Sequence, residues 1–217
     1  MLGRRINLEP GALFEKLVTR RRGGYCFEQN GLFLMALEAM GFTARPLLAR
    51  VLLDPAGPSA RTHQVALVEL DGASWLADVG FGAGTLGRAI PMEPDNIEVM
   101  QDASYRIILK EPFGATLQRR ETGDWHDQYA FSLERVLPAD IQLGNHYTST
   151  SPDVHFTQRR ITMLAHPRGR SELLNMELSF LRDGQKETRT LSDGGEYLAA
   201  LREHFGIELD TDFADFK

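Results

Sequence analysis

Two runs of alternating apolar and polar residues flank the dipeptide Asp71-Gly72: THQVALVEL precedes it and ASWLADVGF follows it. Asp-Gly between two such runs is the strongest short-range signal for a β-hairpin with a two-residue loop. This loop places Leu70 opposite Ala73, so the numbers of paired residues add up to 143. The register constrains the fold strongly, because a slip by one residue would turn every side chain of a strand to the other face of the sheet.

The hairpin register brings an imidazole close to a carboxylate. It puts His63 opposite Gly80 and Val65 opposite Asp78, so His63 and Asp78 are diagonal neighbours on one face, with backbones about 7–8 Å apart. Side chains can close that distance, and a carboxylate bound to one ring nitrogen fixes the tautomer of the other. We therefore expect a hydrogen-bonded pair. Taken singly, the two residues also fit a solvent-facing histidine and a strand-end aspartate.

The remaining sequence alternates in blocks between helical and strand-like periodicity. Apolar residues at helical spacing predict helices over 9–20, from about 25 to a stop at Gly41, and from a cap at Ser192 to a stop at Gly206. Strands are expected within 43–53, 62–70, 73–81, 105–110, 116–120, 127–133, 159–167 and 172–191, and a short helix or irregular crossover at 138–152. Strands in runs with helices at the ends predict an α+β fold.

Charge and composition make several function classes improbable. The 217 residues hold 24 Lys and Arg against 30 Asp and Glu, so no global positive field attracts nucleic acid or anionic lipid. No stretch approaches the roughly 18 apolar residues of a membrane span, and the N-terminus has no apolar signal core. We expect a cytoplasmic protein with no nucleic-acid or membrane partner. Cys26 is the only cysteine, which excludes an internal disulfide and any zinc site built from several thiolates, and we expect no metal.

Cys26 falls in the first turn of the second predicted helix, directly after Gly23 and Gly24. A thiol there meets the positive end of the helix dipole and unpaired backbone N–H groups, which favour the thiolate and can stabilise an oxyanion. Together with His63 and Asp78 it would form a triad of nucleophile, base and carboxylate. A lone cysteine is, however, more often an inert buried residue. The residues by themselves leave both interpretations open.

Three sequence blocks carry a family resemblance. RRGGYCFEQN at 21–30, THQV at 62–65 and ADVGFG at 77–82 resemble, in order and spacing, the motifs of the arylamine N-acetyltransferase family. The resemblance covers nearly the whole chain, including NHYTSTSP at 145–152 and LREHFGIEL at 201–209, and the RGGYCFE block is highly specific. It implies a triad like that of cysteine proteases, with Cys26 as nucleophile, His63 as acid and base, and Asp78 as the orienting carboxylate.

The resemblance also implies an α+β, cysteine-protease-like fold in three parts. Residues 1–42 would be a remnant of a helical domain with the nucleophile helix, 43–137 an antiparallel β-barrel-like domain, and 138–217 a C-terminal α/β region that acts as a lid. Family members normally carry a further N-terminal helical segment with a PFEN motif, whose Glu is expected to pair with the residue that is Arg22 here. This sequence starts after the point where that segment would lie.

The implied reaction is a ping-pong transfer of an acetyl group from the cosubstrate acetyl-CoA to the nitrogen of an arylamine or arylhydrazine, through acetylated Cys26. By resemblance, the arylamine pocket holds Phe81, Phe156 and Val51, the pantetheine arm of coenzyme A meets Thr62 and Gly82, and structural support comes from Arg22, Gly23, Gly24 and Asn30. The sequence leaves three alternatives open: an amide synthase with the same triad, a hydrolase of the same fold, and an inactive, N-terminally shortened homologue.

Overall fold

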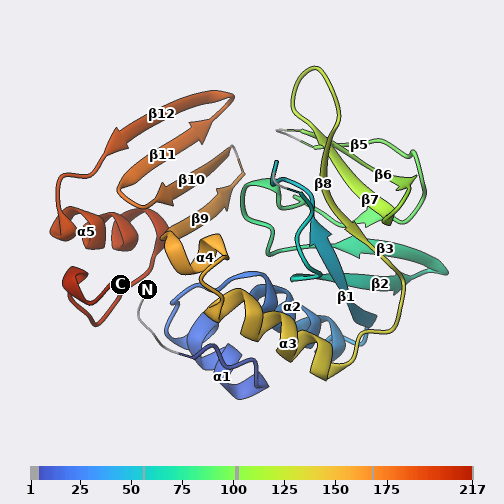
Figure 1. Ribbon diagram of the computed structural model, residues 1–217, viewed down its shortest axis with the longest axis horizontal. Coiled ribbons are helices and arrows are strands. Elements are labelled where there is room, and N and C mark those ends of the chain that lie inside the picture. The colour runs from blue at the N-terminus through green and yellow to red at the C-terminus, as the bar shows by residue number, and fades with distance from the viewer. Residues whose placement is uncertain (1–4, 56, 101–102, 168, 217) are drawn as a thin grey trace. The chain divides into compact units, whose positions relative to one another are not determined.

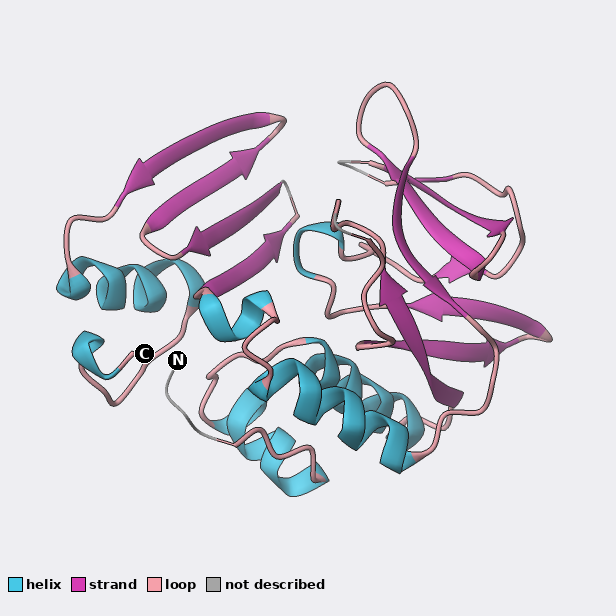
Figure 2. Ribbon diagram, in the orientation of Figure 1, coloured by secondary structure: helices cyan, strands magenta, loops and turns pink. Residues whose placement is uncertain are grey.

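The computed structural model describes residues 5–55, 57–100, 103–167 and 169–216, and Figures 1 and 2 show its helices and strands. The chain divides into two compact units. One is formed by residues 25–145, and the other by residues 1–24 together with 146–217. The division into 1–42, 43–137 and 138–217 stays a prediction, and each unit is described by itself below.

The unit of residues 25–145 is built on one eight-stranded sheet with the order β4-β3-β2-β1-β8-β7-β6-β5. Its strands are β1 (Thr43–Val51), β2 (His63–Leu70), β3 (Ala73–Ala77), β4 (Ile90–Pro91), β5 (Glu98–Val99), β6 (Ser104–Lys110), β7 (Gly114–Arg120) and β8 (His126–Phe131). Neighbouring strands pair antiparallel, and the sheet curls into a barrel-like form (Figure 1). Its buried core includes Leu47, Val65, Leu117, Tyr129 and Phe131.

Helix α2 (Cys26–Ala39) packs against this sheet. Its Leu37 joins Ala66, Val68 and Ala77 in a second buried cluster, so the helix covers strands β2 and β3. The helix ends where the sequence predicts, because Gly41 takes φ +84°, a left-handed conformation that glycine adopts without steric cost. Packing on the sheet fixes the N-terminal turn of α2, which holds Cys26.

The hairpin between β2 and β3 has the predicted register. Leu70 pairs with Ala73 and the ladder continues to Ala66 opposite Ala77. Asp71 and Gly72 both have positive φ, 52° and 78°, as a two-residue type I′ loop requires. The strand pairing stops at Ala77, so the following residues 78–81 leave the ladder at the end of the sheet that carries His63.

The second unit combines helices from both ends of the chain with a small sheet. Its elements are α1 (Pro10–Phe14), the π-helix η1 (Glu15–Thr19), α4 (His155–Gln158), β9 (Ile161–His166), β10 (Gly169–Leu174), β11 (Glu177–Arg182), β12 (Gln185–Thr190), α5 (Gly194–Phe205) and the 3-10 helix η3 (Phe213–Asp215). The sheet order is β12-β11-β10-β9, and α5 lies along one of its faces (Figure 1). Leu173, Leu178, Tyr197 and Leu201 form the core between them.

Two local features differ from the sequence expectation, and one expectation that was left open is resolved. Residues 9–20 form α1 followed by a π-helix, in which the Arg20 N–H donates to the carbonyl of Glu15 over five residues. The stretch 138–152, left open as helix or crossover, forms α3 (Pro138–Thr150). The N-cap of α5 is Asp193 rather than Ser192: its Oδ1 accepts from the Glu196 N–H at 2.9 Å. Ser192 instead donates to the Glu196 carboxylate.

Across the described residues, every helix is too short or too polar to cross a membrane.

Candidate active site

Cys26 is the first residue of α2 and its side chain is buried. The residue before it, Tyr25, has an extended backbone, and its N–H donates to the Glu28 carboxylate at 3.2 Å. The Cys26 Sγ lies 3.7 Å from the carbonyl oxygen of Thr62, the residue that precedes His63. The sulfur therefore sits at the positive end of a 14-residue helix and next to the start of β2.

His63 and Asp78 form the predicted pair. The His63 Nε2 lies 2.7 Å from the Asp78 Oδ2, and both side chains are buried. Burial alone lowers the pKa of His63, but the charge of Asp78 and the hydrogen bond to it outweigh burial and, with the Cys26 side chain, raise the pKa to about 10. Because Nε2 binds Asp78, the ring nitrogen left for Cys26 is Nδ1. The pair thus favours a protonated imidazole beside the sulfur.

Asp78 is held by two further hydrogen bonds. Its Oδ1 accepts from the Asn30 Nδ2 and from the Gly80 backbone N–H, both at 2.9 Å. Burial raises the pKa of Asp78, but the charge of His63 and the bonds from His63, Asn30 and Gly80 lower it below its usual value. The carboxylate therefore stays ionised and is oriented through both of its oxygens.

Asn30 links the helix of Cys26 to both other members of the site. It lies four residues after Cys26 on α2 and is fully buried. Besides Asp78, its Nδ2 donates to the Gln64 carbonyl at 2.7 Å, and its Oδ1 accepts from the Val79 N–H at 3.1 Å. One side chain thereby fixes α2 against the start of β2 and the segment after β3.

Gly80 allows this segment to approach α2 closely. A Cβ atom at this position would lie 2.8 Å from the Cys26 Cα and 2.8 Å from the Asn30 Nδ2. Real Cβ atoms do not approach backbone so closely, so any other residue would push the nucleophile and the carboxylate apart. The close packing of the site thus explains why position 80 of the ADVGFG block is a glycine.

Two aromatic rings pack against the imidazole of His63. The ring centroids of Phe81 and Tyr129 lie 4.9 and 5.1 Å from that of His63, and 4.9 Å from each other. The Tyr129 hydroxyl is buried, and burial, followed by the charge of Asp78, raises the pKa of this phenol well above its usual value. Sequence reasoning missed Tyr129, because only the long-range pairing of β8 with β1 brings it to the site, where Val51 is its partner across the strands.

The other predicted site residues lie in both units. Val51 is half-buried at the end of β1, and Gly82, with φ +71°, begins the 3-10 helix η2 (Gly82–Gly84) directly after Phe81. Phe156 lies in α4 of the other unit, with its ring 4.0 Å from that of His155, so its place in a pocket with Phe81 stays a prediction.

Arg22, Gly23 and Gly24 belong to the unit of residues 1–24 and 146–217. The Arg22 N–H donates to the Lys16 carbonyl at 2.9 Å. Gly23 has φ +67°, and a Cβ atom at this position would lie 3.3 Å from the Ile207 Cδ1. No group of three or more His, Cys, Asp or Glu side chains within the described ranges is placed to hold a metal ion.

The sequence model of a family described as "N-acetyltransferase" matches residues 1–214. Arylamine N-acetyltransferase of Escherichia coli strain K12 is 37% identical over 214 residues, which cover 97% of this chain and 75% of that protein. The chain belongs to the arylamine N-acetyltransferase family. It is accordingly a transferase, as the sequence blocks predicted.

Solved structures of arylamine N-acetyltransferases agree with this membership. That of the Salmonella typhimurium arylamine N-acetyltransferase superposes with a TM-score of 0.91 at 33% identity, covering 99% of this chain and 81% of that one. The Mycobacterium marinum arylamine N-acetyltransferase in complex with CoA gives a TM-score of 0.92 at 30% identity, covering 99% and 82%. The predicted α+β arylamine N-acetyltransferase fold is confirmed.

Proposed function

We propose that the chain transfers an acetyl group from acetyl-CoA to the nitrogen of an arylamine or arylhydrazine by a ping-pong mechanism. Cys26 accepts the acetyl group in the first half-reaction. The observation that carries the proposal is the buried cluster of a helix-terminal thiol, an imidazole and an ionised carboxylate, with His63 and Asp78 joined at 2.7 Å. The M. marinum relative was solved in complex with CoA, which supports acetyl-CoA as the donor.

In the first half-reaction, the Cys26 thiolate attacks the carbonyl carbon of the acetyl thioester. A bond forms between that carbon and Sγ, and the bond to the sulfur of coenzyme A breaks. The departing sulfur takes the proton of the His63 imidazolium. One thioester replaces another, so this step changes the free energy little. The positive N-terminus of α2 stabilises both the thiolate and the developing oxyanion.

In the second half-reaction, the amine nitrogen attacks the acetyl carbon on Cys26. A carbon–nitrogen bond forms, the bond to Sγ breaks, and the nitrogen passes a proton to neutral His63. This restores the starting thiolate and imidazolium. An aromatic amine suits the step, because its weakly basic nitrogen is uncharged at neutral pH and needs no prior deprotonation.

Asp78 orients the imidazole and stabilises its protonated form, while Asn30 and Gly80 hold the carboxylate. By resemblance, Phe81, Phe156 and Val51 would line the pocket for the flat aromatic ring. Thr62 and Gly82 would contact the pantetheine arm of coenzyme A, and their positions directly before His63 and after Phe81 support this. Arg22, Gly23 and Gly24 would support the turn that leads into α2.

Intact-protein mass spectrometry after brief incubation with acetyl-CoA tests the proposal. Without an amine, the wild-type chain should gain one acetyl group, the folded variant Cys26→Ala should gain none, and an added arylamine should remove the group from the wild type as the acetylated amine. Absence of the adduct from a folded sample would refute the acetyltransferase mechanism. An adduct that water removes as fast as the amine would instead favour the hydrolase alternative.

A further inference from the structure

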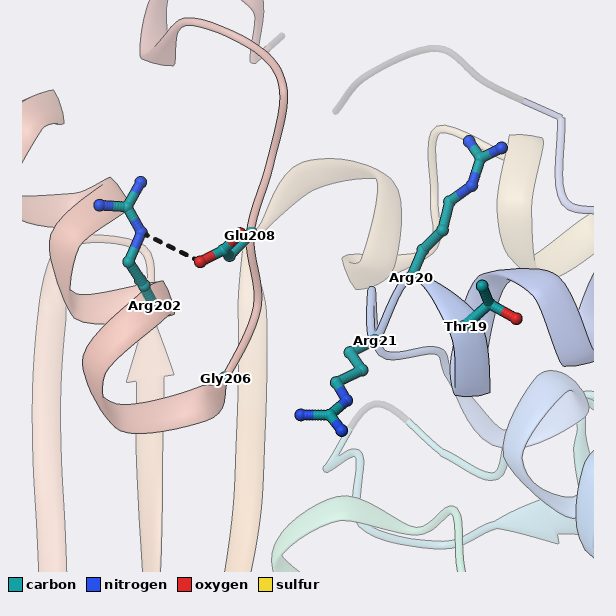
Figure 3. A pocket seen from close by; sticks show the side chains of 6 residues that line it. All are labelled: Thr19, Arg20, Arg21, Arg202, Gly206 and Glu208. Carbon is teal, nitrogen blue, oxygen red and sulfur yellow. Dashed lines mark ion pairs between the residues drawn. The ribbon is translucent and has the colours of Figure 1, made fainter.

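A basic cleft lies within the unit of residues 1–24 and 146–217, between the end of η1 and the end of α5. Two adjoining hollows of about 400 and 530 Å³ share Thr19, Arg20, Arg202 and Glu208 as lining residues, and Arg21, Arg22, Gly206, Leu209 and Asp210 complete them. Figure 3 shows the smaller hollow. Four arginines and two carboxylates line the two hollows, so positive charge exceeds negative by two in a chain whose net charge is -6.

Arg21 is the unusual residue of this cleft. It has φ +48° and directly follows the last turn of the π-helix, a position where helices commonly place glycine because a side chain is strained there. Gly23 and Gly24 follow two and three residues later. The segment therefore contains glycines, but the strained position itself is occupied by Arg21. π-Helices and left-handed non-glycine residues both concentrate at functional sites.

The strained backbone at Arg21 is fixed from both sides. The Arg20 N–H donates to the Glu15 carbonyl and the Arg22 N–H to the Lys16 carbonyl, each at 2.9 Å. Figure 3 shows the Arg21 side chain directed toward the end of α5 near Gly206, whereas Arg20 points away from it. Within the described part of the chain, no ion pair or hydrogen bond engages the Arg21 guanidinium.

Two other arginines of the cleft form ion pairs of different length. Arg20 pairs with Glu15 at 2.7 Å, whereas the Arg202 Nε lies 3.6 Å from the Glu208 Oε1, at the long end of an ion pair, with both side chains mostly exposed. An incoming anion can therefore recruit Arg202 as well as Arg21 without breaking a tight contact. Two guanidinium forks with an excess of positive charge match a phosphate group that carries more than one negative charge.

We infer that this cleft is a binding site for a small phosphate-bearing anion, with Arg21 and Arg202 as its ligands. The cleft contains none of the triad residues, and the inference does not depend on the acetyl-transfer mechanism. The phosphate could belong to a free phosphorylated metabolite or to coenzyme A, and both present the same chemistry to the cleft.

Isothermal titration with pyrophosphate at low ionic strength tests the inference, using the wild type, Arg21→Gly and Arg189→Ala. Arg189 is an exposed arginine of the same unit that pairs with Glu196 outside the cleft, so its variant matches the loss of charge. We expect Arg21→Gly to weaken binding about tenfold, the effect of one charged hydrogen bond, and Arg189→Ala to change it less than twofold. Thermal unfolding of Arg21→Gly should occur at an equal or higher temperature, because glycine relieves the strained φ.

Several outcomes would overturn the inference: no binding to the wild type at millimolar pyrophosphate, unchanged affinity in Arg21→Gly, an equal loss in Arg189→Ala, or equally tight binding of citrate. If Arg21→Gly unfolds, Arg202→Ala must weaken binding about fivefold or more for the inference to stand. Displacement of pyrophosphate by coenzyme A would support that cosubstrate as the source of the phosphate, and binding of pyrophosphate without such competition would support a free metabolite.

Discussion

Replacement of Asn30 by alanine should strongly destabilise the unit that carries the triad. The substitution removes three hydrogen bonds of a fully buried side chain, at 2.7, 2.9 and 3.1 Å. A bond to an ionised group contributes about 1.5–3 kcal/mol and a neutral one about 0.5–1.5 kcal/mol. The expected loss is therefore about 2.5–6 kcal/mol of unfolding free energy, a large part of the 5–15 kcal/mol typical of a folded protein.

Urea unfolding followed by circular dichroism measures this loss, with Asn96→Ala as the matched control. Asn96 makes one local side-chain bond, to Glu98 at 3.0 Å, and its variant should lose no more than about 1 kcal/mol. Asn30→Asp should be worse than Asn30→Ala near neutral pH, because it sets a second carboxylate beside Asp78. A loss below about 1 kcal/mol for Asn30→Ala would show that Asn30 does not hold the site together.

Three further predictions concern the same site. Because the pKa of His63 is raised to about 10 and that of Asp78 is lowered, the ion pair contributes fully to stability between about pH 4 and 6.5. Unfolding free energy should fall as the pH rises from about 6.5 to 10. Urea titrations should show a flatter profile over this range in Asp78→Asn, and an identical slope would contradict the assignment. Gly80→Ala should slow acetylation of Cys26 at least about tenfold in a timed mass-spectrometry assay, one decade for each 1.4 kcal/mol of barrier, whereas Gly87→Ala, whose Cβ would meet only the Met100 sulfur at 3.6 Å, should match the wild type. Tyr129→Phe keeps the ring against His63 and should change unfolding free energy by less than about 1.5 kcal/mol, whereas Tyr129→Ala should cost about 3–5 kcal/mol in thermal unfolding.

Local sequence signals predicted the hairpin and the carboxylate–imidazole contact. The Asp71-Gly72 loop fixes one register between β2 and β3, and although the pairing ends at Ala66–Ala77, that register brings the next residue, Asp78, within reach of His63. The first turn of α2 is likewise predictable, because Gly24 precedes a long apolar run. For the contact between His63 and Asp78, the residues within about 20 positions of the loop were sufficient.

Contacts set by long-range packing could not be predicted in this way. Tyr129 reaches His63 only because β8 pairs with β1, and the three bonds of Asn30 depend on how α2 is placed on the sheet. The sequence predicts the N-cap of α5 at Ser192, one residue before the observed cap at Asp193. Serine and aspartate are both good N-caps, and only the bond to the Glu196 N–H distinguishes them. The π-helix η1 has the same apolar spacing in sequence as an α-helix would.

The residues of the two units become available for folding at different stages of synthesis. Residues 25–145 are continuous in sequence, so a growing chain holds the triad residues together with Asn30 and Gly80 before residues 146–217 are synthesised. The other unit joins residues 1–24 to residues 146–217, and it can be completed only after residues 146–217 have been synthesised. Because domains fold as units from the N-terminal side during synthesis, the nucleophile helix is expected to pack on its sheet before residues 1–24 can form a unit with residues 146–217.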